Sequence, residues 1–357
     1  MVLPDGRRLV RAMDGKPSKS SGDSFMGMRI LNQAQVTELL PMAECVELME
    51  AALMTLARGE ATLPLRTVFR VPPGRGIFGV MPAHLSKPAA LGLKAIGVFP
   101  ENEGTRRDSH QGLVLLFSPE TGAPLAVMDA SSITAIRTAA VSGVATRALS
   151  RPDAGDLAIL GSGVQARTHL EAMAVVRPLR RVRAWSRHPG RLAAFAEWAG
   201  TRFGPSVETT GSAEAAVQGA DLICTTTASS TPVVEAGWLA PGVHINAVGS
   251  SMSQARELDS ATVAGARLVV DRRESAIHEA GDYLIPLAEG AITDSHIAGE
   301  LGDVLLGRVP GRRSPAERTV FKSLGIAIED LAAAHHVLAK AEARGIGLVT
   351  ELGGLRA

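Results

Sequence analysis

Residues 156–166 read DLAILGSGVQA, an apolar run followed by a glycine-rich turn and a helix-like segment. Gly161 permits a tight turn, and Gly163 lets the backbone approach an anion closely. The amide groups at the N-terminus of the following helix then face that anion. Ala166 stands at the third glycine position of this pattern, which allows alanine. A lone GxG is often a loose turn, but a strand before it and a helix after it predict a site for the pyrophosphate of a dinucleotide.

The segments after this turn alternate between strand-like and helix-like. The strand-like runs are RVRAWSR, ADLICTTT, VHINAVG and ARLVVD, and helix-like segments separate them. This alternation predicts a parallel sheet with crossover helices. We therefore expect an α/β fold that contains a Rossmann doubly wound parallel sheet.

The residues before the turn follow a different pattern. A helix is predicted over residues 41–59, where Pro41 suits the first turn and Gly59 the C-terminal cap. Five strand-like runs follow it, which indicates an antiparallel or mixed sheet. A last long helix, residues 323–345, carries an apolar stripe, and we expect it to fold back on this N-terminal sheet.

The composition is that of an ordinary globular chain of 357 residues. A net charge of +1 and an aromatic content of 3% give no basis for binding nucleic acid or an acidic membrane surface. We find no apolar run of about 18 residues and no signal-peptide pattern, so we expect no membrane association. Cys45 and Cys224 form no metal or redox motif, so we expect no metal site and a cytoplasmic location. Residues 1–27 show no periodicity and are predicted to be a flexible extension.

The second strand of the alternating region ends in Ser186 and Arg187. A site that prefers NAD(H) usually ends this strand with Asp or Glu, which binds the ribose 2′-hydroxyl. A hydroxyl followed by a guanidinium suits a 2′-phosphate instead. The sequence therefore favours NADP(H), with NAD(H) possible. An exposed arginine that binds no ligand is the remaining alternative.

Three basic residues stand where the local sequence does not favour them. Arg137 lies in the first turns of the predicted helix SSITAIRTAA, where the helix dipole disfavours a cation. Lys94 interrupts the apolar run LGLKAIGVF, and Arg66 lies within LPLRTVF. Each alone is more often an edge residue whose charge reaches water. Together, ahead of a nicotinamide-binding unit, they indicate a pocket for a carboxylate, and His110 is either a polar core residue or a cofactor contact.

Eight motifs, in this order, resemble the ornithine cyclodeaminase/μ-crystallin family: LPLRTVF, GVMPAH, GLKAIGVFP, SHQGLVLLF, MDASSITAIRTAA, LGSGVQA, HINAVG and TVFKSLGIAIED. The resemblance extends from Met28 to about Gly345 and is closer to the ketimine and imino-acid reductases than to true cyclodeaminases. It implies a homodimer. It also implies that a Rossmann domain, residues 148–319, is inserted into an α+β substrate-binding and dimerisation domain, residues 28–147 plus 320–357.

The resemblance also assigns site residues. The residues assigned to the substrate pocket are Arg66, Met81, Lys94, Arg137, Ser251 and Glu279. The residues assigned to the dinucleotide are His110, Thr138, Gly161, Ser162, Gly163, Val164, Gln165, Ser186, Arg187, Thr225, Thr226, Ala247, Val248 and Ser323. Lys94 and Arg137 are the predicted catalytic residues.

Two positions depart from the cyclodeaminase pattern. Ser251 stands where those enzymes carry an aspartate that acts as a base, and Gly79 stands where they carry a glutamate near the substrate amine. Serine cannot replace aspartate as a base without an activating partner. We therefore interpret Ser250 and Ser251 as a polar edge of the nicotinamide pocket.

These residues predict a reductase of a small imino acid or ketimine that carries a carboxylate; in reverse it would be an amino-acid dehydrogenase. Arg137 and Arg66 would orient the carboxylate, and Lys94 would bind it or transfer a proton to the imine nitrogen. One alternative is an ornithine cyclodeaminase, which releases ammonia from ornithine to give proline without net change of the cofactor. The other is a non-catalytic protein that binds NADP(H) and a small carboxylate, as in μ-crystallin-like members.

Overall fold

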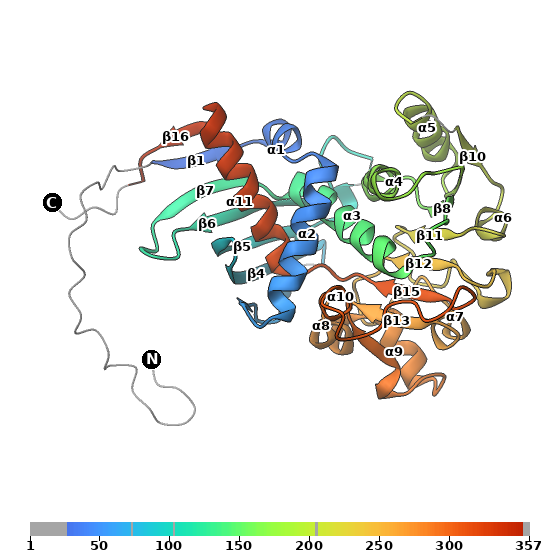
Figure 1. Cartoon of the computed structure of the whole chain (residues 1–357). Coiled ribbons are helices and arrows are strands. Elements are labelled where there is room, and N and C mark those ends of the chain that lie inside the picture. Colours follow the sequence, from blue (N-terminus) through green and yellow to red (C-terminus); the bar gives the residue numbers. More distant parts are fainter. Residues whose placement is uncertain (1–26, 73, 103, 204–205, 353–357) are drawn as a thin grey trace.

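The computed structural model describes residues 27–72, 74–102, 104–203 and 206–352. Two sheets form the body of the chain, and long helices lie between and against them (Figure 1). The predicted extension, residues 1–27, lies outside the described residues except for Gly27. The α/β class with a parallel Rossmann sheet, predicted from the sequence, is confirmed.

The first sheet is mixed, as the N-terminal pattern predicts. Its strands are β1 (Met28–Leu31), β2 (Ala61–Thr62), β3 (Thr67–Val71), β4 (Gly76–Ser86), β5 (Ala89–Val98), β6 (His110–Phe117), β7 (Pro124–Asp129) and β16 (Leu348–Thr350). They lie in the order β16-β1-β7-β6-β5-β4-β2, with β3 paired to β4. The β1–β7 pair is parallel and the other pairs are antiparallel.

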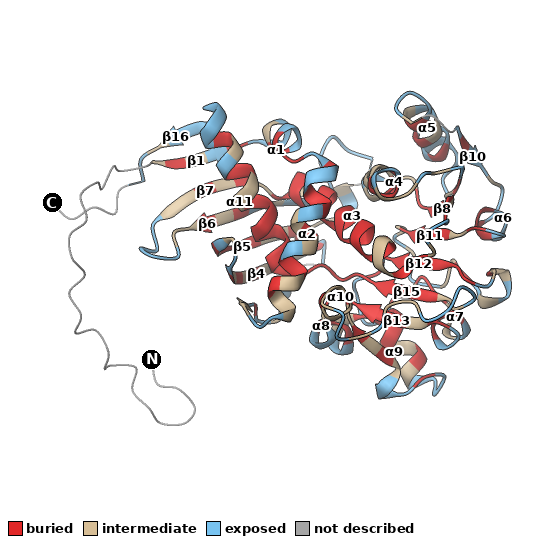
Figure 2. Ribbon diagram, viewed as in Figure 1, coloured by how far each residue is buried: buried red, intermediate tan, exposed pale blue. Residues whose placement is uncertain are grey.

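Three long helices cover one face of this sheet: α2 (Met42–Ala57), α3 (Ala130–Leu149) and α11 (Ala327–Arg344). The short helix α1 (Gln33–Leu39) precedes them. Small residues along α3 let its neighbours approach closely, so almost the whole helix is buried (Figure 2). Helix α11 returns to the sheet as predicted, and it ends at Gly345, whose left-handed φ of 65° closes the last turn.

Strand register decides which residues lie beneath these helices. Met81 pairs with Lys94, Lys94 with Val114, and Val114 with Met128, so the four share one face across four adjacent strands. All four are at most 7% exposed. Lys94 therefore occupies the middle of a buried row that is otherwise apolar.

The second sheet is parallel throughout. Its strands are β8 (Asp156–Leu160), β9 (Arg181–Trp185), β10 (Val207–Thr209), β11 (Leu222–Thr225), β12 (His244–Ala247), β13 (Arg267–Val270), β14 (Ile297–Glu300) and β15 (Thr319–Lys322). Its helices are α4 (Val164–Val176), α5 (Pro189–Gly200), α6 (Ala213–Val217), α7 (Ser260–Ala264), α8 (Arg273–Glu279), α9 (Gly281–Ala288) and α10 (Leu301–Leu305), with 3-10 turns at Ala236–Trp238 and Asp294–His296. A further 3-10 turn, Pro100–Asn102, lies between β5 and β6 of the first sheet. The order β10-β9-β8-β11-β12-β15-β13-β14 reverses direction between β8 and β11. In open α/β sheets, ligands bind at the carboxyl ends of the strands beside such a reversal.

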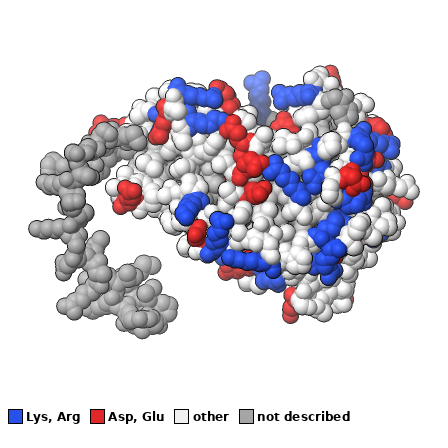
Figure 3. Space-filling model, viewed as in Figure 1, with Lys and Arg blue, Asp and Glu red and all other residues white. Residues whose placement is uncertain are grey.

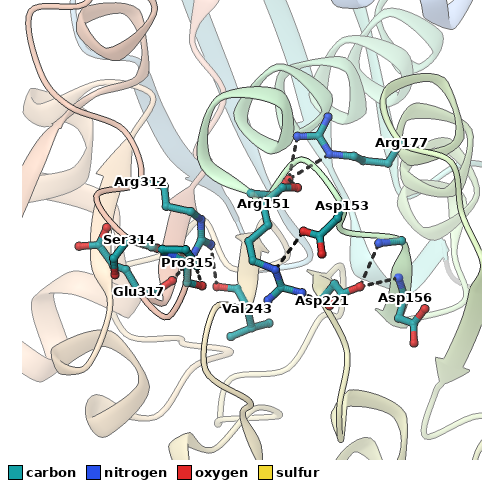
Figure 4. Close-up of polar contacts among 12 residues, drawn as sticks. Arg151, Asp153, Asp156, Arg177, Asp221, Val243, Arg312, Ser314, Pro315 and Glu317 are labelled. Atoms are coloured by element: carbon teal, nitrogen blue, oxygen red, sulfur yellow. Dashed lines mark hydrogen bonds and ion pairs between the residues drawn. The ribbon is translucent and has the colours of Figure 1, made fainter.

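Charged side chains fasten the amino ends of the central strands β8 and β11 to the end of α3 (Figure 4). The Asp221 carboxylate accepts hydrogen bonds from the amides of Gly155 and Asp156, at 3.0 and 3.1 Å, and pairs with Arg151 at 2.5 Å. Arg177 donates to the carbonyl of Thr146, within α3, at 2.9 Å. These contacts fix the passage from α3 into β8.

The structure differs from the predicted domain boundary at one place. Residues 320–322, which the prediction gives to the substrate-binding domain, lie in β15 of the Rossmann sheet. Strand β15 pairs on both sides, with β12 and β13, so these residues belong to the centre of that sheet. The remaining boundaries stay a prediction.

Candidate active site

The glycine turn connects β8 to α4 at the point where the strand order reverses. Gly161 has a φ of 123°, and a Cβ atom there would lie 2.5 Å from Thr226 Oγ1. Gly163 is the N-cap of α4, and a Cβ atom there would meet no atom within 4 Å. The first glycine is therefore required by the protein itself, whereas the second leaves open space in front of the helix N-terminus. That space fits the pyrophosphate of a dinucleotide, which Ser162 and the first amides of α4 would hold.

Hydroxyl groups converge beside this turn. Ser162 Oγ donates to Ser186 Oγ at 3.0 Å, which connects the turn to the end of β9. Arg187 follows and is exposed, and its Nε lies 3.3 Å from His188 Nε2. The structure thus brings Ser162 and Ser186 together and leaves the Arg187 guanidinium at the surface of the predicted ribose site.

A buried glutamate, which the sequence analysis missed, organises the ends of β11 and β12. The Glu257 carboxylate accepts from Thr225 Oγ1 at 2.7 Å, from Thr227 N at 2.8 Å and from Gly249 N at 2.7 Å. Burial, and then the nearby carboxylate of Asp282, raise the pKa of Glu257. Asp282 is itself paired with buried Lys322 at 2.8 Å. The sequence carries no local signal for this network, because its members are far apart along the chain.

Four charged residues form a buried cluster beneath the first sheet. Lys94 Nζ lies 2.8 Å from Asp330 Oδ2, and Asp330 Oδ1 accepts from Arg137 Nε at 3.0 Å. Arg137 Nη1 lies 2.5 Å from Glu329 Oε2. Each of the four side chains is at most 4% exposed. We refer to Lys94, Arg137, Glu329 and Asp330 as the charged cluster.

The charged cluster corrects one part of the sequence interpretation. The anionic partner expected for Arg137 is supplied by the protein, through Glu329 and Asp330 in the first turn of α11. Neither acid was predicted as a site residue, because acidic residues are common in the first turn of a helix and so give no signal of their own. Arg137 Nη2 makes no hydrogen bond to any residue that the structure describes, so this amino group is free to bind a further anion.

Burial changes the protonation of this cluster. Desolvation, assisted by the charge of Arg137, lowers the pKa of Lys94 to about 8 although Asp330 opposes the shift. Burial also raises the pKa of Glu329 to about 8, against the effect of Arg137. Desolvation and the charge of Lys94 lower the pKa of His110. Lys94 can therefore lose or gain a proton near neutral pH, as an acid–base group must.

Arg66 connects the first sheet with the second. Its Nη2 lies 2.8 Å from Glu279 Oε2, in α8, and donates to the Ser251 carbonyl at 3.0 Å. Arg66 immediately precedes β3, whose Thr67 pairs with Val80, the neighbour of Met81. The structure therefore brings three predicted substrate residues together as Arg66, Ser251 and Glu279.

Ser250 and Ser251 have different environments. Ser250 is 4% exposed, and its hydroxyl donates to the carbonyl of Ala255 at 2.5 Å. Ser251 is exposed, and its backbone rather than its hydroxyl contacts Arg66. Neither hydroxyl has a basic partner among the described residues, so neither is activated as a nucleophile or base.

The other predicted cofactor residues lie along the same strand ends or beside them. Ser323 N donates to the Ala247 carbonyl at 3.1 Å, and Val248 N donates to the Thr225 carbonyl at 3.0 Å. Thr226 Oγ1 donates to the Leu160 carbonyl at 3.0 Å. In α4, Val164 is 59% exposed, whereas the buried Oε1 of Gln165 has no hydrogen-bond partner. Thr138 is buried next to Arg137 in α3. Whether these residues contact a dinucleotide stays a prediction.

Two further observations concern ligands of other kinds. Among the described residues, no group of three His, Cys, Asp or Glu side chains is arranged to hold a metal ion. No described helix is both long and apolar enough to span a membrane. Acidic and basic side chains are interspersed over the face shown in Figure 3.

The loop after β15 leads from the carboxyl ends of the parallel strands, where the glycine turn lies, to the charged cluster. A dinucleotide site next to buried ionisable groups is the arrangement of a dinucleotide-dependent oxidoreductase. The chain belongs to the ornithine cyclodeaminase/μ-crystallin family, whose model matches residues 27–345.

Relatives at high coverage support this assignment. The mouse protein named ketimine reductase μ-crystallin is 42% identical over 289 residues, which are 80% of this chain and 88% of the mouse protein. The structure of Thermococcus litoralis Δ1-pyrroline-2-carboxylate reductase in complex with NADH and L-proline has 40% identity and a TM-score of 0.89, covering 90% of this chain and all of that one. An archaeal alanine dehydrogenase dimer with bound NAD has 34% identity and a TM-score of 0.87, covering 92% of this chain and all of that one.

The two glycines of the turn should respond differently to alanine. Gly161→Ala introduces a Cβ atom against Thr226 at a φ that alanine rarely adopts, so strain on the order of 1–3 kcal/mol should lower the melting temperature. Gly163→Ala should leave the melting temperature of the free protein unchanged. Both variants should bind NADPH at least about tenfold more weakly, as measured by fluorescence of the bound nicotinamide. Unchanged NADPH binding in Gly163→Ala would contradict the placement of the pyrophosphate.

Proposed function

We propose that this protein is an NAD(P)H-dependent reductase of a small imino acid or ketimine, and that it transfers hydride to a C=N bond next to a carboxylate. The observation that carries the proposal is the charged cluster, in which Lys94 is held ready for proton exchange and Arg137 keeps a free amino group. The relatives named Δ1-pyrroline-2-carboxylate reductase and ketimine reductase support it.

The reduced nicotinamide, when bound, supplies the hydride. Arg137 Nη2 binds the substrate carboxylate, and Arg66, released from Glu279, binds it from the other side. This fixes the position of the imine carbon relative to the cofactor edge. Lys94 donates a proton to the imine nitrogen, and its lowered pKa makes that transfer easy near neutral pH. An already protonated iminium accepts hydride without further acid chemistry.

The surroundings of Gly79 and Ser251 support a reductase rather than a cyclodeaminase. The nearest atoms to a Cβ at Gly79 are methyl groups of Val68 and Ile96, at 3.6 and 3.8 Å, and the Thr67 carbonyl oxygen at 3.8 Å, so none of them belongs to a carboxylate. Ser251 presents its carbonyl to Arg66. A second substrate amine would therefore find no carboxylate at either position.

For the cofactor, we propose a preference for NADP(H). The chain has Ser186 and exposed Arg187 at the end of β9, where an acidic residue would otherwise bind the 2′-hydroxyl. The relatives of known structure contain NADH or NAD, so use of NAD(H) by this protein is the alternative that the kinetic test below decides. We also propose a cytoplasmic location, which the free thiols of Cys45 and Cys224 support.

We further propose a homodimer formed through the face of the first sheet that no described helix covers. Strand register places Pro82, Leu93, Leu115 and Val127 in one row on the face away from α2 and α11. Leu113 and Phe69, also on strands of this sheet, are 48% and 56% exposed. An apolar sheet face of this extent needs a partner. The archaeal alanine dehydrogenase dimer is consistent with this assembly.

The reaction is tested by following absorbance at 340 nm with purified protein, NADPH or NADH, and a panel of cyclic and acyclic imino acids that includes Δ1-pyrroline-2-carboxylate. We expect oxidation of NADPH with at least one of them. Ornithine with NAD, assayed for ammonia, should give none. Ammonia release from ornithine without net change of the cofactor would establish a cyclodeaminase, and binding of NADPH without any turnover would establish a binding protein.

Two lysine variants test the role of Lys94 in this assay, one as the test and one as its control. Lys94→Met keeps an unbranched side chain in the buried row but removes the proton donor, so kcat should fall at least about 100-fold. Lys340→Met removes a lysine of α11 that pairs with Glu44 of α2, and kcat should not change.

The cofactor preference is tested with Arg187→Ala. Loss of a charge-assisted contact to the 2′-phosphate should raise the KM for NADPH about tenfold or more. The KM for NADH should change less than twofold. Arg58→Ala, which changes an exposed arginine at the end of α2, is the matched control. Equal changes for both cofactors would remove Arg187 from the ribose site.

The dimer is tested with Leu113→Glu, which places a charge on the exposed apolar face. Burial of an unpaired carboxylate at the interface is costly, so the variant should sediment as a monomer. Thr121→Glu, in the exposed turn between β6 and β7, should leave the oligomeric state unchanged. A Leu113→Glu protein that remains dimeric would exclude this face as the interface.

A further inference from the structure

The charged cluster contains as many carboxylates as cations. Lys94 and Arg137 face Glu329 and Asp330, and nothing in the cluster is more than 4% exposed. With all four groups ionised, the cluster therefore has no net charge. A substrate carboxylate that binds to Arg137 adds a negative charge to a site from which water is largely excluded, where an uncompensated charge is expensive.

The two carboxylates of the cluster are bound differently. Asp330 Oδ1 accepts a hydrogen bond from Arg137 Nε, and Asp330 Oδ2, which has no hydrogen bond to a described residue, lies 2.8 Å from the charged Lys94 Nζ. Glu329 uses only Oε2, while its Oε1 is buried without a hydrogen-bond partner. Each carboxylate thus has one buried oxygen without a hydrogen bond, but only that of Asp330 has a cation beside it, so ionised Glu329 is the less stable of the two. Glu329 is therefore the group that can be neutralised at the smaller cost.

The groups around Glu329 on every neighbouring element act on its proton. Arg137 on α3 and Lys94 on β5 stabilise the ionised form, whereas Asp330 on α11 and Asp271 after β13 oppose it. On α2, the Cys45 thiol is close enough to experience the charge of Glu329. Asp271 itself accepts hydrogen bonds from the amides of Leu324 and Gly325. Burial raises the pKa of Glu329 to about 8, so its protonation is accessible near neutral pH.

We propose that Glu329 takes up one proton from solvent when the substrate carboxylate binds to Arg137. The total charge of the buried site is then the same before and after binding. Neutral Glu329 also weakens its contact with Arg137 Nη1, so Nη1 and Nη2, which share one edge of the guanidinium, can both bind the incoming carboxylate. This proposal rests on the proposed binding of an imino-acid carboxylate, and it assigns Glu329 as a positioning residue that acts through Arg137.

Proton uptake is measured by titration calorimetry on the wild-type protein saturated with NADP⁺. The ligand is pyrrole-2-carboxylate, an unreactive planar carboxylate, and two buffers of different ionisation enthalpy are compared at pH 6 and pH 9. We expect close to one proton taken up at pH 9 and little at pH 6, because a group titrating near 8 is already protonated at the lower pH. The Kd should rise about tenfold per pH unit above 8. Binding at pH 9 without proton uptake would overturn the proposal.

Lys94 also titrates near pH 8, so a second measurement identifies the group. Difference infrared spectroscopy of wild-type protein, with the ligand carboxylate labelled with ¹³C, should show a protonated carboxyl band that grows on ligand binding at pH 9. Absence of this band would assign the proton to Lys94 and overturn the proposal. This measurement needs no variant and does not depend on how a substituted protein folds.

Glu329→Gln mimics the neutral form of the side chain. It should bind pyrrole-2-carboxylate at pH 9 about tenfold more tightly than wild type and take up less than half as many protons. Glu342→Gln, on an exposed position of the same helix, is the matched control. Equal uptake in Glu329→Gln and wild type would overturn the proposal. If the protein reduces an imino acid but takes up no proton when pyrrole-2-carboxylate binds, only this inference is rejected. If it neither binds the ligand nor reduces an imino acid, the proposed function is rejected as well.

Discussion

A lysine in the middle of an apolar buried row is the constraint on which this structure depends. Lys94 lies between Met81 and Val114, beneath α11, and cannot reach water. An isolated ammonium there would be unstable, and removing one partner of a buried ion pair typically costs about 3–5 kcal/mol. Asp330 supplies the carboxylate that the ammonium needs. Because Asp330 lies in the first turn of α11, this pair forms only when the chain returns from β15 to the first sheet. The ion pair between Lys94 and Asp330 therefore serves both the proposed proton transfer and the packing of α11 on the first sheet.

The same crossing connects the cofactor edge with the substrate pocket. Asp271 holds the amides of Leu324 and Gly325, and Ser323 N bonds to the end of β12. Gly325, with a φ of 75°, packs so closely on Arg137 that a Cβ atom would lie 2.5 Å from Nη1. The backbone of this loop thus fixes one face of the guanidinium while α11 fixes its edges.

The parts that could be predicted from the sequence are those with local causes. The glycine turn, the alternating strands and the period of α11 depend on neighbouring residues, and the structure has all three. Lys94 and Arg137 could be selected because each conflicts with its surroundings. Their partners could not be found in the same way, since Arg137 and Asp330 are 193 residues apart and only the fold brings them together. Glu257 was not predicted for the same reason. The predicted domain boundary fell inside β15 because a short apolar run does not show to which domain its residues belong.

The distribution of carboxylates around the pocket bears on the chemistry as well as on stability. Glu329 and Asp330 are paired with Arg137 and Lys94, and Glu279 is paired with Arg66, so each carboxylate of the proposed substrate pocket already has a cationic partner. Two other buried acids nearby, Glu257 and Asp271, accept hydrogen bonds from hydroxyl and backbone N–H groups instead. A reaction that must hold and deprotonate a second ammonium group needs an acid without such a partner. Hydride transfer to a C=N bond needs only an oriented carboxylate and one mobile proton, and those are the two things that Arg137 and Lys94 can supply. The pairing of these charges therefore favours imine reduction over cyclodeamination more strongly than any single residue of the pocket does.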